Sequence, residues 1–305
     1  MRTFVKRRGI FPDVLFFTLL FATLITVTDY NLRRKIMIKL IISDLDGTFL
    51  NSQTKFDENL YQEVRQIMHR QNVIFAPCTG KQCERVEALF KNVGSEDLWI
   101  LGDSATRIKH KDKYMYESLL PNTIGKKIIA KLQSIHQDFT IIACTQTAAI
   151  ISEDTPAESE KMVRGSYEVV EKIADYQEIN DDFVKITVYD GKLRSYEVAP
   201  QLAEFEKQAY IVASEAAWID ITNFGVHKRH TVEELQQILQ VSSQETMVFG
   251  DGHNDLELMQ AGEFSFAMRN AFEETKAAAK YICKSNDENG VLLTIKQLLS
   301  LQEEN

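Results

Sequence analysis

From Met37 onward, short apolar runs alternate with stretches that are apolar on one side only. Residues 38–43 form a continuous apolar run before an acidic turn, which predicts a strand buried on both faces. Residues 59–69 place apolar side chains on one side and therefore predict an amphipathic helix. The same reasoning predicts strands at 73–76 and 98–101 and a helix at 82–90. Strands and helices that alternate in this way are typical of a parallel α/β sheet.

The pattern changes between about residues 118 and 217. An alternating segment at 184–189 and a helical stretch at 124–135 predict an inserted α+β domain here. The parallel pattern then returns, with helices expected at 232–239, 255–261 and 273–280 and strands at 246–249 and 264–268. We therefore expect a Rossmann-like parallel-sheet core made of residues 37–117 and 218–305, with residues 118–217 inserted as a second, α+β domain.

The N-terminal 36 residues differ from the rest of the chain. Basic residues at 6–8 precede an apolar run at residues 14–27, which as a helix is about 21 Å long, shorter than the roughly 30 Å bilayer core. Three interpretations stay open: an upstream extension, since Met37 looks like a natural start, a membrane anchor, or a cleaved signal. We expect a cytoplasmic enzyme, with membrane contact possible only through residues 1–36.

Composition and charge narrow the possible partners. Apolar residues make up 44% and charged residues 26% of the 305 residues, which is typical of a globular protein. Residues 1–36 hold 7 basic and 2 acidic residues, whereas the remaining chain holds 28 and 42. A body this acidic argues against nucleic acid as a partner, because phosphate backbones bind basic surfaces. A small phosphorylated substrate needs only a local positive site.

The four cysteines do not suggest a metal or disulfide site. Cys78, Cys83, Cys144 and Cys283 form no C-x-x-C pair and have no zinc-ligand spacing. We therefore expect free or buried thiols in a reducing compartment.

The first informative turn is the sequence Asp-Leu-Asp-Gly-Thr at residues 44–48. Turns after successive parallel strands meet at one edge of a sheet, where ligands bind. If Gly47 lets the chain turn, Asp44 and Asp46 can face one site, where one carboxylate attacks phosphorus and the other moves protons. The alternative is an Asx turn between strand and helix.

A second turn, after the strand at 73–76, holds Thr79 and Gly80. A hydroxyl and a free backbone N–H at the start of a helix suit a phosphate oxygen. The alternative is a capping box, because Gln82 lies three residues after Thr79.

The third turn opens with Gly250 and Gly252 and holds Asp251, Asn254 and Asp255. Such a group of hard oxygen atoms suits Mg²⁺, although a tight turn capped by Asn254 would use the same residues. Lys228 lies upstream, before the helix expected at 232–239. It could neutralise a phosphate, or it could be an ordinary solvated surface lysine.

In this order and at these strand ends, the motifs resemble the haloacid dehalogenase superfamily. The long insertion and the stretch IDITNFGVHKRHTVEEL are similar to its Cof-type branch, which carries a C2-type cap at residues 118–217. The resemblance implies that Asp44 is the nucleophile and a metal ligand. It implies that Asp46 is the general acid/base and offers its backbone carbonyl to Mg²⁺. The remaining implied roles are phosphate binding by Thr79, Gly80, Lys228 and Asn254, direct metal binding by Asp251, and metal support by Asp255.

The function implied is a Mg²⁺-dependent phosphatase that hydrolyses small phosphorylated metabolites, such as sugar or cofactor phosphates, through an aspartyl phosphate. The alternatives are a phosphotransferase or mutase, or a non-catalytic regulatory protein that keeps the fold.

Two positions depart from the family pattern. Lys81 stands where relatives often have arginine, and Asp103 stands in a turn that is often Asn-Gly-Ala. We expect Asp103 to add negative charge near the substrate entrance.

Overall fold

The computed structural model describes residues 37–303. The N-terminal 36 residues, including the candidate membrane segment at 14–27, and residues 304–305 lie outside the described part. Residues 37–305 form a compact unit by themselves. Within the described residues, none of the helices combines the length and apolar character needed to cross a membrane.

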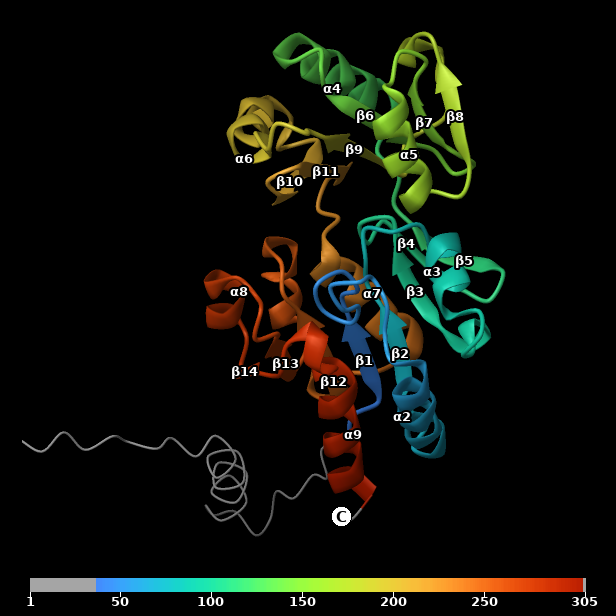
Figure 1. Ribbon diagram of the computed structural model, residues 1–305, viewed down its shortest axis with the longest axis vertical. Coiled ribbons are helices and arrows are strands. Elements are labelled where there is room, and N and C mark those ends of the chain that lie inside the picture. Colours follow the sequence, from blue (N-terminus) through green and yellow to red (C-terminus); the bar gives the residue numbers. More distant parts are fainter. Residues whose placement is uncertain (1–36, 304–305) are drawn as a thin grey trace, which may run out of the picture. The chain divides into compact units, whose positions relative to one another are not determined.

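The core is built on a five-stranded parallel sheet in the order β14-β13-β12-β1-β2 (Figure 1). Its strands are β1 (Leu40–Ser43), β2 (Ile74–Pro77), β12 (Thr246–Gly250), β13 (Phe264–Ala267) and β14 (Tyr281–Ile282). Its helices are α2 (Glu58–Arg70), α3 (Cys83–Phe90), α7 (Lys228–Leu239), α8 (Glu273–Ala278) and α9 (Gly290–Glu303), with short 3-10 turns η1 (Ser95–Asp97), η4 (Ser243–Glu245), η5 (His253–Asp255), η6 (Leu258–Gln260) and η7 (Asn286–Glu288). The expected parallel core is confirmed.

Strand β1 is buried on both faces, as its apolar run predicted. Ile41 packs in one cluster with residues of α2 and α9. Leu40 and Ile42 pack in another cluster with residues of α7, because successive side chains of a strand point to opposite faces. β1 therefore lies inside the sheet, between β12 and β2, with Asp44 at its carboxyl end.

The strand expected at 98–101 is β3 (Trp99–Gly102), and it has two sets of neighbours. A parallel bridge between Cys78 and Leu101 continues the core sheet past β2. An antiparallel hairpin, β4 (Arg107–His110) and β5 (Lys113–Glu117), pairs with the other edge of β3. The sequence did not predict this hairpin. The reversal is made by Asp103, Ser104 and Ala105, whose φ angles are all positive, at 55°, 59° and 63°.

The inserted domain contains a six-stranded sheet in the order β10-β11-β9-β6-β7-β8. Its strands are β6 (Thr140–Cys144), β7 (Ala149–Ser152), β8 (Val170–Ile173), β9 (Lys185–Tyr189), β10 (Ala209–Glu215) and β11 (Trp218–Asn223). Its helices are α4 (Asn122–Ile135), α5 (Ala157–Ser166) and α6 (Ser195–Val198), with 3-10 segments η2 (Tyr176–Glu178) and η3 (Ala199–Phe205). Only β7 and β8 pair in parallel; the other pairs are antiparallel.

The boundary expected between residues 217 and 218 divides a hairpin. Strand β11 pairs with both β10 and β9, so it belongs to the inserted sheet and not to the core. Alternation along the sequence identifies a strand but does not reveal which sheet receives it, because pairing partners are set by tertiary structure. We propose that the inserted domain, hereafter the cap, extends from about residue 118 to Asn223.

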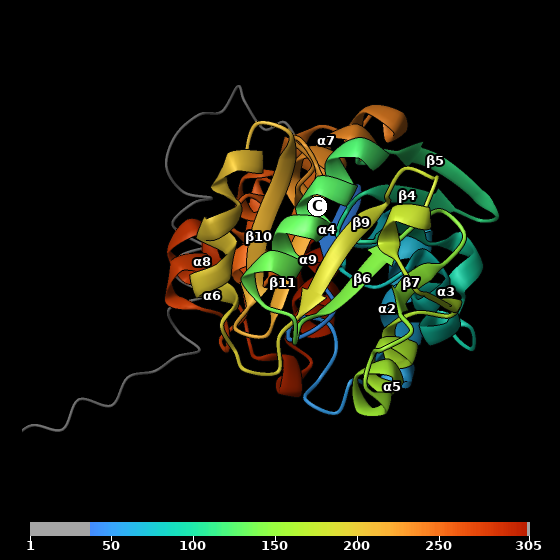
Figure 2. The same ribbon diagram turned by 90° about the horizontal axis from the view of Figure 1, so that it is seen from above.

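The cap sheet has an apolar face and a polar face. Ile186 and Val188 of β9 and Ile219 of β11 belong to an apolar cluster that includes residues of α4. Figure 2, viewed from the cap side, shows α4 lying across these strands. Because side chains alternate along a strand, Lys185 and Asp220 face the opposite way, toward the core.

One expected helix is wrong. Residues 255–261 form no α-helix; the chain there makes the two 3-10 turns η5 and η6. The carboxylate of Asp255 bonds back to the N–H groups of Asp251 and Gly252, and this tightens the turn.

Candidate active site

A cavity of about 800 Å³ lies between the carboxyl ends of the core strands and the polar face of the cap sheet. The core lines it with residues from all three predicted turns: Asp44, Asp46, Thr79, Gly80, Lys81, Asp251, Gly252 and Asn254. The cap contributes residues that include Tyr167, Lys185, Thr187, Ser214, Glu215, Trp218 and Asp220. The tertiary structure therefore brings the predicted turns together, as the parallel sheet required.

Lys228 joins two of the predicted carboxylates, and one of them, Asp44, borders this cavity. Its ammonium nitrogen lies 2.6 Å from Oδ1 of Asp44 and 2.6 Å from Oδ1 of Asp255. The side chain is 4% exposed, so the alternative of a solvated surface lysine is wrong. Helix α7 begins at Lys228, four residues earlier than expected. A cation in a first helical turn is opposed by the helix dipole, so the two carboxylates must hold it there.

The pKa of Lys228 reflects this competition. Burial opposes its charge, but Asp255 and Asp44 outweigh that effect and raise the pKa well above the usual value for lysine. The residue is therefore a permanent cation at this site.

Gly47 lets the first turn approach the third. Its φ is +77°, and a Cβ atom there would lie 2.4 Å from Oδ2 of Asp251. The next residue, Thr48, donates its hydroxyl hydrogen to Oδ1 of Asp251 at 2.5 Å. The sequence did not single out Thr48, since nothing in its position shows which carboxylate it meets.

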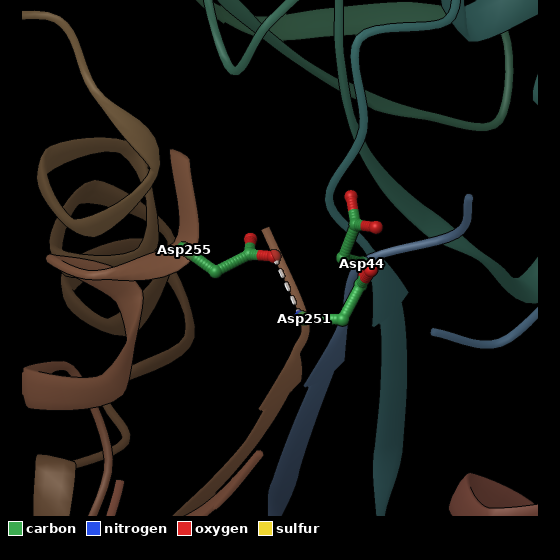
Figure 3. A group of neighbouring side chains, drawn as sticks. All are labelled: Asp44, Asp251 and Asp255. Atoms are coloured by element: carbon green, nitrogen blue, oxygen red, sulfur yellow. Dashed lines mark hydrogen bonds between the residues drawn. The ribbon is translucent and has the colours of Figure 1, made fainter. Parts of the chain in front are cut away.

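The acidic side chains crowd one another. Oxygen atoms of Asp44, Asp251 and Asp255 lie within 4.8 Å of one another, at the ends of β1 and β12 (Figure 3). Burial raises the pKa of Asp44 well above its usual value; Lys228 works against this, and Asp255 and Asp251 add to it. Burial, followed by the charge of Asp255, raises the pKa of Asp251 to about 7. One lysine does not balance this negative charge, and a divalent cation would.

Asp255 differs from the other two carboxylates because both of its oxygens have partners. Oδ1 accepts from Lys228, and Oδ2 accepts from the N–H groups of Asp251 and Gly252, each at 3.0 Å. The side chain is fully buried. Asp255 therefore shapes the turn that carries Asp251. A tight turn was the alternative to a metal site in the sequence analysis, and the turn is present.

Thr79 is not a helix cap. Helix α3 begins at Cys83 with Gln82 as its N-cap residue, so the capping-box alternative is wrong. The Thr79 hydroxyl oxygen instead accepts from the N–H of Lys81 at 3.2 Å, and the residue is buried beside the cavity.

Both departures from the family pattern have definite partners. The ammonium of Lys81 contacts both carboxylate oxygens of Asp46, at 2.9 and 2.7 Å. Asp103 is buried and faces Arg107 at 3.8 Å, and it is not among the residues that line the cavity. The expectation that Asp103 adds charge at the substrate entrance is therefore wrong. Burial, opposed by Arg107, raises its pKa to about 6.

Lys185 of the cap was missed in the sequence. Its ammonium donates to the carbonyl oxygen of Gly80 at 2.7 Å and to the Ser104 hydroxyl at 3.1 Å. Asp220 lies 3.6 Å away and also accepts from Ser104, Thr187 and Ser214. One feature of the sequence could have indicated it: residues 184–189 follow the alternation of a strand, and one of these positions is a lysine.

The four cysteines are free and buried, as predicted. Burial raises the pKa of Cys78, which lies close to the site, to about 12. A thiol held neutral in this way is a poor nucleophile.

Known proteins are similar to this chain over most of its length. The family model described as haloacid dehalogenase-like hydrolase matches residues 41–295. The chain is 28% identical over 267 residues to 5-amino-6-(5-phospho-D-ribitylamino)uracil phosphatase YbjI of Escherichia coli, covering 86% of this chain and 96% of that protein. It is 25% identical over 289 residues to the phosphatase YwtE of Bacillus subtilis, whose name gives the same substrate, covering 87% of this chain and 99% of that protein.

A solved structure is similar over the same part of the chain. The crystal structure of a Streptococcus mutans UA159 protein has a TM-score of 0.82 and 27% sequence identity, covering 86% of this chain and 99% of that one. The family match spans both the core and the cap. The chain belongs to the haloacid dehalogenase-like hydrolase family, as the order of its three strand-end turns predicted.

Proposed function

We propose that this protein is a Mg²⁺-dependent phosphatase that hydrolyses phosphate monoesters of small metabolites through an aspartyl phosphate on Asp44. The observation that carries the proposal is the contact of Lys228 with Asp255 and with Asp44, which borders the cavity. A buried cation beside a carboxylate at a strand end provides a nucleophile and a positive charge for the same phosphoryl group.

The metal would be held by Asp44, Asp251 and the backbone carbonyl of Asp46. Three observations fit a divalent cation: oxygen donors only, closely grouped carboxylates, and a shortage of positive charge. Asp255 has both oxygens engaged, so its part is to hold Asp251 and Lys228 in place. When bound, Mg²⁺ neutralises negative charge on the phosphoryl group.

The remaining phosphate contacts would come from the second and third turns. Thr79, Gly80 and Asn254 border the same cavity as Asp44, and they carry a hydroxyl, a backbone N–H and an amide. Together with Lys228 they supply hydrogen-bond donors on several sides of a phosphoryl group. Loose phosphoryl transfer depends mainly on such positioning and charge neutralisation.

The reaction has two steps. A carboxylate oxygen of Asp44 attacks phosphorus, the bond from phosphorus to the leaving oxygen breaks, and Asp46 gives its proton to that oxygen. In the second step Asp46 takes a proton from a water molecule whose oxygen attacks the aspartyl phosphate. The phosphorus–Asp44 bond breaks, inorganic phosphate leaves, and both side chains return to their starting states.

The substrate class is a phosphorylated sugar, sugar alcohol or cofactor. The cavity has room for a metabolite of this size, and hydroxyl and carboxylate groups of Thr187, Ser214 and Asp220 border it on the cap side. Curated relatives are named as phosphatases of a ribityl phosphate, which is a primary alkyl phosphate.

The test is release of inorganic phosphate by the purified full chain. A panel of alkyl phosphates would be supplied with Mg²⁺, and Asp44→Asn and Asp46→Asn would be compared with the natural chain. We expect Asp44→Asn to lose about 10⁴-fold or more in kcat, and Asp46→Asn to be slow enough for phosphoenzyme to accumulate. Full activity in Asp44→Asn would exclude this mechanism. Phosphoryl transfer to a sugar acceptor in place of water would indicate a phosphotransferase.

A further inference from the structure

We propose that Lys81 is a positioning residue that holds the carboxyl group of Asp46 for proton transfer to the leaving group. The inference rests on the proposed function, because it assigns Asp46 the role of general acid. It goes further by assigning a task to a residue that departs from the arginine common in relatives.

The first support is the geometry of the contact. The Lys81 ammonium lies 2.9 Å from Oδ1 and 2.7 Å from Oδ2 of Asp46, and both residues border the cavity. Because the ammonium reaches both oxygens, one oxygen can keep this hydrogen bond while the other carries the proton. The carboxyl group is therefore held in one orientation while its proton leaves.

The second support is the way the backbone of Lys81 is fixed. Its N–H donates to the Thr79 hydroxyl oxygen at 3.2 Å, and its carbonyl oxygen accepts from the N–H of Asp103 at 2.8 Å. The preceding carbonyl, that of Gly80, accepts from Lys185 of the cap at 2.7 Å. The ammonium thus extends from an anchored point, which a positioning group requires.

The third support is that neither stability nor phosphate binding accounts for the pair. The side chains of Lys81 and Asp46 are 24% and 47% exposed, and ion pairs exposed to this degree contribute little to stability. Phosphate charge is already met by Lys228, which contacts Asp44 directly. The contact of Lys81 is instead with Asp46, the group that must reach the leaving oxygen.

The leaving group provides the test. An alkyl phosphate releases a strongly basic alkoxide unless an acid protonates it, whereas p-nitrophenyl phosphate releases a stable phenolate and hardly needs that acid. In the full chain with Mg²⁺, Lys81→Ala should lower kcat/KM about 10- to 100-fold for an alkyl phosphate and less than about threefold for p-nitrophenyl phosphate. This quantity reports the departure of the leaving group and not the later hydrolysis of the aspartyl phosphate, which both esters share. Lys81→Arg should recover part of the alkyl-phosphate rate, because it keeps a cation of similar reach.

Two further variants make the result decisive. Because Lys81 acts through Asp46, the double variant Lys81→Ala/Asp46→Asn should be no slower on the alkyl phosphate than Asp46→Asn alone. Lys296→Ala removes a lysine that pairs with Glu63 on the surface, and it should change neither rate. Retained hydrolysis of p-nitrophenyl phosphate also shows that Lys81→Ala is folded.

Two results would overturn the inference. Equal losses on both esters would mean that Lys81 binds phosphate or supports the fold, and additive losses in the double variant would mean that it acts apart from Asp46. A natural chain that hydrolyses neither ester would overturn the proposed function itself, which is a separate and recognisable outcome.

Discussion

The ammonium of Lys185, on cap strand β9, donates a hydrogen bond to the carbonyl oxygen of Gly80 in the core at 2.7 Å. This contact ties the cap to the turn that carries Thr79 and Lys81. The lysine is 2% exposed, and burial opposes its charge; the surrounding groups, including Asp220, nevertheless raise its pKa above the usual value. This buried cation therefore links the cap to the core beside the cavity.

Lys185→Met should therefore loosen the cap while keeping the shape of the side chain. We expect KM for an alkyl phosphate to rise about tenfold and the free energy of unfolding to fall by about 2–3 kcal/mol, since Asp220 loses a buried partner. Steady-state kinetics and denaturant titration measure the two effects. The matched control is Lys192→Met, an exposed cap lysine that pairs with Asp138 and should leave both quantities nearly unchanged. An unchanged KM in Lys185→Met would show that Lys185 does not hold the cap over the cavity.

Removal of divalent metal should stop hydrolysis, and added Mg²⁺ should restore it, because Asp44, Asp251 and Asp255 carry more negative charge than Lys228 balances. Mg²⁺ should also raise the melting temperature, since a bound cation relieves the repulsion among these carboxylates. Ca²⁺ should inhibit, because its coordination is larger and looser. Phosphate release and thermal unfolding measure these effects, and undiminished activity after thorough chelation would rule the metal out.

Gly47→Ala should lower the stability of the protein through backbone strain and through a clash with Asp251. Substitution of a second glycine, Gly225, separates these two effects. The φ of Gly47 is +77°, and a Cβ atom would collide with Asp251, whereas Gly225 has φ +76° and open space around it. Gly225→Ala should lose only about 1 kcal/mol of unfolding free energy through backbone strain. Gly47→Ala should lose at least about 2 kcal/mol and weaken Mg²⁺ activation about tenfold, because Asp251 must move. Equal effects of the two substitutions would show that contact with Asp251 is unimportant.

A chain that begins at Met37 should match the full chain in activity. Residues 37–305 form a compact unit by themselves, and β1 pairs with β2 and β12 within that unit. We expect kcat/KM to agree within about twofold and melting temperatures within about 2 °C. A large loss of either on truncation would show that residues 1–36 support the catalytic unit.

Local pattern and chain order predicted the positions of the reactive side chains. The apolar run at 38–43 identified a buried strand, so Asp44 was expected at its carboxyl end and is found there. The turns with Thr79 and Asp251 were expected at the same edge, because carboxyl ends of parallel strands share one edge. The roles of these residues stay predictions until the variants above are measured.

The sequence pattern could not predict which distant segments pair with one another. Strand β11 was assigned to the core because its alternation is the same in either sheet, yet it pairs with β9 and β10 of the cap. The expected helix at 255–261 is two short 3-10 turns, η5 and η6, and the Asp255 carboxylate there bonds back to the N–H groups of Asp251 and Gly252. Asp103 is buried against Arg107 and not at the entrance, because a left-handed turn reverses the chain.

The family, the parallel core and the three turns could be predicted from the chain alone, because they depend on side-chain periodicity and on residue types at fixed places along it. The partners of each charge became known only from the fold: Lys228 with Asp44 and Asp255, Lys81 with Asp46, and Lys185 with Gly80. These pairs join residues 27 to 184 positions apart. A charged side chain pairs with a group that is near it in space, and the packing of sheets and helices decides which group that is.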